Sequence, residues 1–159
     1  MAGLFWILYR AGPEAVQERL VGPHPLLGLA LGSTLAGFLV ALSRLLAKRW
    51  SRLQRMEQAF ARILGPLPPR GSLLLAASSA WGEEVVFRAC LQPEIGLAAS
   101  AVIFGCLHLP LERELILWTP FALAMGFLLG WLYQLHGALA APLALHFLVN
   151  LLNLRRLAR

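Results

Sequence analysis

The order of apolar and polar residues along the chain predicts a series of apolar helices separated by short breaks. Five apolar stretches are each followed, at once or within two residues, by proline, glycine or a basic residue: Leu26–Ala47, Ser72–Leu91, Ile95–Leu109, Glu114–Leu135 and Ala138–Leu154. About 20 apolar residues allow a helix to cross the hydrocarbon core of a bilayer. We therefore expect an all-α, polytopic membrane helix bundle with about five transmembrane helices.

The N-terminal part of the chain shows a second, amphipathic pattern. Apolar residues recur at intervals of three and four, with basic residues between them, at Trp50, Leu53, Met56, Phe60 and Ile63. This spacing predicts a helix that lies on the membrane surface. Residues 1–9 and 13–20 are a further interfacial segment by the same reasoning. We assign residues 1–71 to these interfacial elements and the first span, and residues 72–159 to the main bundle, within a single domain.

Composition supports lipid as the solvent. The chain is 58% hydrophobic and only 14% charged, whereas a soluble domain carries about 25% charged residues. The net charge of +6 is concentrated beside apolar spans rather than along a groove with interleaved aromatic residues. This distribution predicts contact with anionic lipid and no nucleic-acid partner. The basic segment 44–70 is therefore expected on the cytoplasmic side, and four further crossings return the basic C-terminus to that side.

One apolar stretch carries three ionisable residues, Glu83, Glu84 and Arg88. No other charge occurs between residues 72 and 93. Charged side chains at bilayer depth are energetically costly, so those present usually face the protein interior and have partners or a function. Glu84 and Arg88 are spaced i,i+4 and can pair on one helix face. Glu83 lies about 100° round the helix, which makes it the freer carboxylate.

Two other apolar stretches carry polar residues at the same spacing: Phe104 with His108, and His146 with Asn150. Each alone has a structural explanation, such as a histidine bonded to a carbonyl or an asparagine that joins two helices. Together with the acidic residues they predict one polar pocket. Because Glu83 lies about 18 Å along its helix from residue 71, while His108 lies at a helix end, the pocket requires a tilted or broken helix.

Hydrolysis is the chemistry that such a pocket favours. Glu83 is the candidate base that takes a proton from water and passes it to a leaving amine. The two histidines and Asn150 are candidates to polarise a carbonyl or stabilise an oxyanion. Glu83, His108 and His146 are alternatively three ligands for a catalytic zinc ion, although no His-Glu-x-x-His motif is present. Ser78 and Ser79 precede the acids by one turn but lack the sequence context of a nucleophile.

The three motifs in order resemble those of one protein family. Glu-Glu-x-x-x-Arg (83–88), Phe-x-x-x-His (104–108) and His-x-x-x-Asn (146–150) are similar to the motifs of CAAX protease and bacteriocin-processing (CPBP) proteins, intramembrane endopeptidases related to the type II CAAX prenyl protease. The resemblance covers roughly residues 72–154 and implies that 72–159 is the catalytic bundle.

This resemblance also implies a role for each matching residue. Glu83 would activate water, Glu84 would support it, and Arg88 would hold the second carboxylate. His108 and His146 would orient the water or stabilise the oxyanion, and Asn150 would assist. Phe104 would be structural support. Members are often called metalloproteases, and a metal-free glutamate mechanism fits these residues equally well.

We therefore expect an intramembrane endopeptidase that cuts a membrane-associated peptide, with a lipidated, CAAX-like peptide as one substrate class. Its partners would be membrane lipid and the substrate, and its location a prokaryotic plasma membrane. A catalytically silent protein of the same fold, with an immunity or scaffold role, is the alternative. A small transporter or proton relay is a third interpretation, which an internal repeat would favour; the sequence contains no repeat.

Overall fold

A computed structural model describes residues 9, 12–110 and 112–158 of the chain. Most of the expected 1–9 segment therefore lies outside the described residues. All described elements are helices, which confirms the all-α fold. Their bounds are α2 (Pro13–Leu20), α3 (Pro25–Ala47), α4 (Ser51–Leu64), α5 (Pro69–Glu84), the π-helix η1 (Val85–Leu91), α6 (Gln92–Leu107), the 3-10 turn η2 (Arg113–Leu115), α7 (Trp118–His136) and α8 (Ala140–Leu157).

Local sequence explains where several helices begin and end. Proline occupies the first turn of α2, α3 and α5, where its missing N–H leaves no hydrogen bond unmade. Gly137 ends α7 in the left-handed conformation, with φ 76°, which glycine adopts without steric cost. These three starts and this end therefore follow from the positions of proline and glycine.

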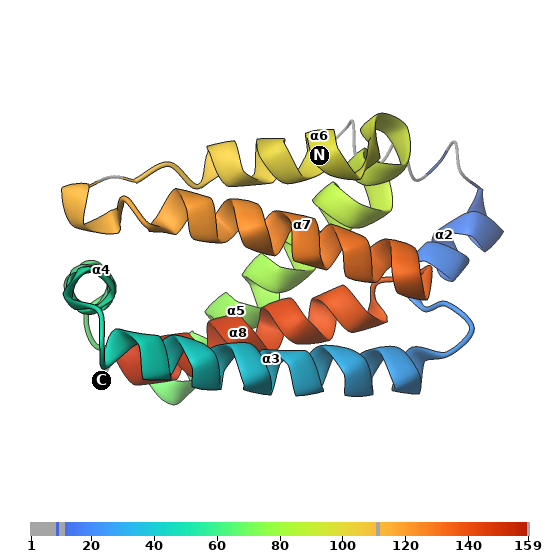
Figure 1. The fold of residues 1–159 in the computed structure, drawn as a ribbon. Coiled ribbons are helices and arrows are strands. Elements are labelled where there is room, and N and C mark those ends of the chain that lie inside the picture. The colour runs from blue at the N-terminus through green and yellow to red at the C-terminus, as the bar shows by residue number, and fades with distance from the viewer. Residues whose placement is uncertain (1–8, 10–11, 111, 159) are drawn as a thin grey trace.

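The long apolar core lies between α3, α7 and α8. α3 and α8 run alongside each other in the same direction (Figure 1), and α7 lies over them. Buried side chains of the three helices form one cluster: Ala36, Val40, Met125, Leu129, Leu132, Ala141, Leu145 and Val149. A Cβ atom on Gly32 would overlap the Ala141 carbonyl oxygen. Small residues thus bring α3 and α8 close together, as is typical of helices packed in lipid.

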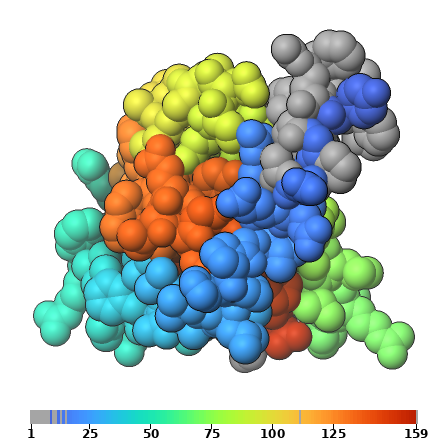
Figure 2. Space-filling model, turned by 90° about the vertical axis from the view of Figure 1, so that its right-hand side faces the viewer, coloured from blue at the N-terminus to red at the C-terminus, as the bar shows by residue number. Residues whose placement is uncertain are grey.

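A break at Gly96 folds the middle of the chain back on itself. Pro69–Leu107 is one apolar helical stretch of 39 residues, and straight it would measure about 58 Å, nearly twice the bilayer core. Gly96 interrupts it with φ 82° and ψ 166°. The first part therefore crosses the bundle obliquely, and the second returns alongside α7 (Figure 1). Figure 2 shows the resulting layers, with α7 between α6 and α3.

The number of candidate membrane spans differs from the expected five. By length and composition, three stretches of the described chain could cross a membrane: Val16–Ala47, Pro69–Leu107 and Arg113–His136. The second contains two of the predicted spans, joined at Gly96. α8 is absent from the three because His146, Asn150 and the arginines of its last turn lower its hydropathy. An all-α integral membrane bundle is nevertheless what the structure contains.

Helix α4 lies across the end of α3, and Figure 1 views it end-on. Its inner face, Leu53, Met56 and Phe60, packs against Leu115 and Trp118, while Trp50 and Ile63 stay exposed. The expected amphipathic helix is present. Part of its apolar stripe contacts protein rather than lipid, because η2 and the start of α7 pack against it.

Candidate active site

The candidate site is built where α5 passes into the π-helix η1. Glu83 and Glu84 are the last residues of α5, and Arg88 lies within η1. π-helical turns are rare and occur frequently at functional sites. Side chains from outside the turn hold it: the Ser100 hydroxyl donates to the Phe87 carbonyl at 3.1 Å. The backbone that carries the acids is therefore fixed by its neighbours.

Glu84 is the buried carboxylate and has two charged or polar partners. Its exposed fraction is 0%. Oε1 accepts a hydrogen bond from His146 Nδ1 at 2.7 Å, and Oε2 lies 3.2 Å from Arg88 Nε as an ion pair. The structure contains the expected Glu84–Arg88 pair, and adds the bond to a histidine 62 residues away.

Arg88 is fully enclosed and connects three helices. Besides Glu84, its Nη2 donates to the Gly126 carbonyl on α7 at 3.2 Å. Its guanidinium lies 4.7 Å from the ring centroid of Phe104 on α6, which is within the range of a cation–π contact. Phe104 also packs edge-on against Phe87. Arg88 and Phe104 therefore lie in contact beside Glu84.

Glu83 is the freer carboxylate, as the helix geometry predicts. About a third of its side chain is exposed, and its Oε2 forms no hydrogen bond within the described residues. That oxygen lies 3.8 Å from His108 Nε2 and 3.9 Å from His146 Nε2. Both separations exceed a direct hydrogen bond, yet a single water oxygen could bond to either pair of atoms.

The two histidines present the same nitrogen to Glu83. His108 Nδ1 donates to the Phe104 carbonyl at 2.7 Å, and His146 Nδ1 donates to Glu84. Because Nδ1 carries the proton in each ring, Nε2 is the acceptor in the neutral form. His108 ends α6, where Thr119 Oγ1 donates to its carbonyl at 2.6 Å. The break at Gly96 lets this helix end reach Glu83, which is the broken helix that the sequence required.

Asn150 lies one turn beyond His146 on α8 and faces α5. Its Nδ2 donates to Ser79 Oγ at 2.9 Å. Ser79 is one turn before Glu83, so the serine and the acid share a face of α5. Sequence reasoning considered Ser79 only as a nucleophile and did not identify it as a partner of Asn150. The i,i+4 spacing to Glu83 is the signal that could have pointed to it.

Trp118 is a second residue that the sequence analysis did not place at the site. Its ring centroid lies 5.6 Å from that of His108 and 4.9 Å from that of Phe60 on α4. An aromatic contact therefore connects the interfacial helix α4 to His108. No sequence signal distinguishes Trp118 from an ordinary core or interfacial tryptophan.

The proposed zinc ligands were compared with the geometry of a zinc site. Among the described residues, no group of three histidine, cysteine or acidic side chains is arranged to hold a metal ion. Two ligands on a tetrahedral zinc lie about 3.4 Å apart, whereas Glu83 Oε2 is 3.8 and 3.9 Å from the two Nε2 atoms. In this structure the separations between Glu83 and the two histidines are too long for a tetrahedral zinc site.

Comparison with known proteins identifies the family of this chain. Residues 66–152, more than half of the chain, match the family model described as Type II CAAX prenyl endopeptidase Rce1-like. This match confirms the resemblance based on the three motifs. The uncharacterized protein YpbD of Bacillus subtilis (strain 168) is 38% identical over 80 residues, which are 49% of this chain and 41% of YpbD. The chain thus covers less than half of that relative. No solved structure is significantly similar.

Proposed function

Because the chain belongs to the Type II CAAX prenyl endopeptidase Rce1-like family, we propose that it is an intramembrane endopeptidase. Its substrate is a peptide or protein held at a prokaryotic plasma membrane, with lipidated, CAAX-like C-termini as the first class to test. The observation that carries the proposal is the position of Glu83 Oε2, which lies within 3.9 Å of Nε2 of both His108 and His146.

In this mechanism Glu83 is the general base. A water that bonds Glu83 Oε2 and one histidine Nε2 gives its proton to the carboxylate while its oxygen attacks the scissile carbonyl carbon. The histidine accepts the second O–H of this water and so orients it. Since Nδ1 of each ring holds the proton, orientation of the water fits the neutral histidines better than donation to an oxyanion.

Collapse of the tetrahedral intermediate breaks the C–N bond. Glu83 returns its proton to the leaving amine, and the other product is a carboxylic acid that keeps the second proton of the water until it ionises in solvent. The Asn150 amide has a second N–H beside the one that bonds Ser79, and this N–H is the donor for the oxyanion. Glu84 and Arg88 touch no reacting atom here; they hold His146 in place. No step passes through a metal ion.

The test uses detergent-purified protein with quenched-fluorescent peptides, prenylated and unprenylated. Glu83→Gln keeps the shape of the side chain but removes the base. We expect it to lower kcat by about 10²–10⁴-fold. Glu94→Gln is the matched control, because Glu94 is exposed at the start of α6 and belongs to none of the three motifs; it should cleave like the wild type.

Three results would count against the proposal. Equal cleavage by Glu83→Gln and the wild type would remove Glu83 from the mechanism. Loss of cleavage with a chelator, restored by zinc, would replace the metal-free step with the zinc alternative. Absence of cleavage across all peptides would favour the catalytically silent protein with an immunity or scaffold role.

A further inference from the structure

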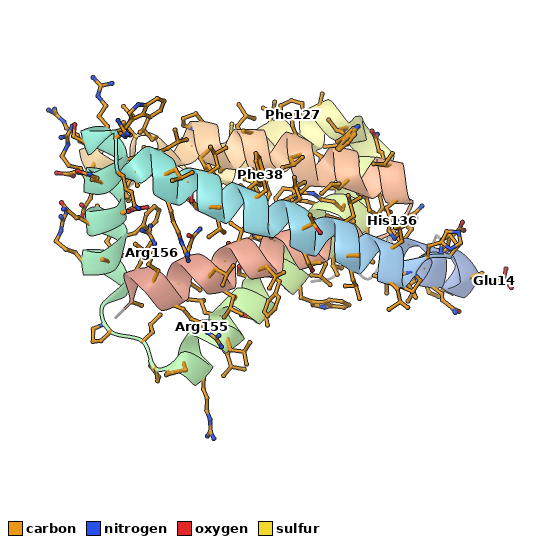
Figure 3. All side chains as sticks on the ribbon, turned by 60° about the horizontal axis from the view of Figure 1, so that its bottom comes forward. Glu14, Phe38, Phe127, His136, Arg155 and Arg156 are labelled. Carbon is orange, nitrogen blue, oxygen red and sulfur yellow. The ribbon has the colours of Figure 1, made fainter. Side chains whose placement is uncertain are left out.

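A charged hollow lies at the end of the bundle where α3, α4 and α8 meet. Its volume is about 350 Å³, and it is lined by Arg44, Ala47, Lys48, Gln54, Glu57 and Arg156. Figure 3 shows Arg156 between the last turn of α8 and α4. Small-molecule sites in proteins occupy about 300–1,000 Å³, so the hollow is large enough for a small polar group.

The side chains that line this hollow carry an excess of two positive charges. Arg156 is bonded to Glu57, so these two charges compensate each other. Arg44 lies in the last turn of α3 and Lys48 is the capping residue four positions later, still in helical conformation, so the two side chains can face the same way. Neither forms an ion pair within the described residues, in contrast to Arg62, which pairs with Glu112. Two uncompensated cations therefore line this hollow.

The hollow lies at the membrane depth expected for a lipid headgroup. The first candidate span ends at Ala47, which lines the cavity. Trp50, two residues after Lys48, is 59% exposed, and exposed tryptophan is enriched at membrane–water interfaces. Helix α4, which has a basic outer face, lies at the same membrane depth. Basic pockets between helices at the cytoplasmic interface bind anionic headgroups.

We propose that this hollow is a binding site for a phosphate group, supplied by the headgroup of an anionic phospholipid. Arg44 and Lys48 would pair with the phosphate oxygens, and the Glu57–Arg156 pair would form the opposite wall. Cations near a helix C-terminus also offset the helix dipole, but that role requires no cavity. The site does not depend on proteolysis, so Glu83→Gln should bind lipid like the wild type.

The test is lipid binding to the full-length protein, measured by native mass spectrometry during titration with phosphatidylglycerol or phosphatidylcholine. The wild type should bind one phosphatidylglycerol in preference to phosphatidylcholine. Arg44→Gln with Lys48→Gln should weaken this binding about thirty-fold, or about fivefold for each cation near the headgroup. The matched control is Arg52→Gln with Arg55→Gln, which removes the same charge from exposed positions on α4 outside the hollow.

The outcomes separate a site from general surface charge. Weaker phosphatidylglycerol binding in the Arg44→Gln/Lys48→Gln variant, with normal binding in the control variant, supports the site. Equally weakened phosphatidylglycerol binding in both double variants would show diffuse attraction between basic protein and lipid. This result would overturn the proposed site. Glycerol phosphate added as competitor distinguishes the source of the phosphate. Displacement of the lipid by submillimolar glycerol phosphate would overturn the assignment to lipid in favour of a soluble phosphate ester.

Discussion

His146 is the residue at which the polar contacts of the site meet. Glu84 fixes its Nδ1, and its Nε2 faces Glu83. The side chain is 8% exposed, so its orientation is set by protein contacts rather than by solvent. The sequence predicted which carboxylate would pair with Arg88 and which would be freer, because that follows from helix geometry. It did not predict that the buried carboxylate binds a histidine.

Ser79 is predicted to position the side chain of Asn150. Ser79→Ala removes the acceptor of the Asn150 amide at 2.9 Å, and a neutral hydrogen bond contributes about 1 kcal/mol. If Asn150 stabilises the oxyanion, kcat should fall about fivefold with KM unchanged. Ser79→Thr, which keeps a hydroxyl, should restore kcat.

Ser78→Ala is the control for this prediction. Ser78 is the neighbouring serine, exposed and bonded to the Leu75 carbonyl of its own helix. The Ser78→Ala substitution should leave kcat at the wild-type value. Equal kinetics for Ser79→Ala and Ser78→Ala would show that Asn150 needs no such support.

Arg88 is predicted to stabilise the fold through Glu84. Arg88→Met leaves a fully buried carboxylate without its cation, which costs about 3–5 kcal/mol. Adding Glu84→Gln should recover part of this loss, because the uncompensated charge is then gone. Unfolding in detergent measures both changes in free energy.

Arg62→Met makes the same substitution in an exposed ion pair with Glu112. It should cost at most about 1 kcal/mol. A similar loss for Arg62→Met and Arg88→Met would mean that burial of the Glu84–Arg88 pair contributes nothing special.

Among the elements, the π-helix η1 and the first residue of α6 are attached to α7 by two hydrogen bonds. Arg88 and Gln92, four residues apart, donate to the carbonyls of Gly126 and Gly130, which are also four apart. The Gly126-x-x-x-Gly130 spacing is expected to bring two backbones close together in lipid. The structure contains this approach, since a Cβ on Gly126 would lie 3.1 Å from the Ala101 carbonyl oxygen of α6.

Gly130→Ala is predicted to loosen this attachment. The added Cβ would lie 2.7 Å from Gln92 Oε1, so the amide must move and its buried hydrogen bond weakens. We expect a loss of about 1–3 kcal/mol in unfolding free energy. Gly37→Ala, at a helical position with open space around it, should instead be neutral or stabilising by up to about 1 kcal/mol. Equal effects of the two substitutions would contradict the role given to Gly130.

For the whole molecule, the C-terminus and the basic segment before α5 lie together. The Leu67 amide donates to the Ala158 carbonyl at 3.0 Å, and Arg156 binds Glu57 of α4. The prediction from charge that these regions share one side of the membrane agrees with this contact.

A C-terminal fusion tests which side that is. Because positive residues are retained in the cytoplasm, a fluorescent protein attached after Arg159 should fold and fluoresce in bacterial cells. Alkaline phosphatase attached at the same residue, which is active only outside the cytoplasm, should be inactive. The reverse pattern would place the C-terminus and residues 44–70 outside.

The sequence by itself determined the fold class, and it predicted most of the helices and one set of polar residues that share a pocket. These follow from local causes: apolar periodicity, proline and glycine at helix ends, and the high cost of a lone charge in lipid. It also predicted that Glu83 and Glu84 differ, since adjacent residues on a helix face different directions.

Only the tertiary structure decided how these residues meet. The turn at Gly96, the bond from His146 to Glu84, the support of Asn150 by Ser79 and the hollow beside Arg44 all join segments distant in the sequence. Such contacts depend on the tilt and depth at which helices pack. Packing of many side chains sets that tilt, and no local pattern in the sequence encodes it.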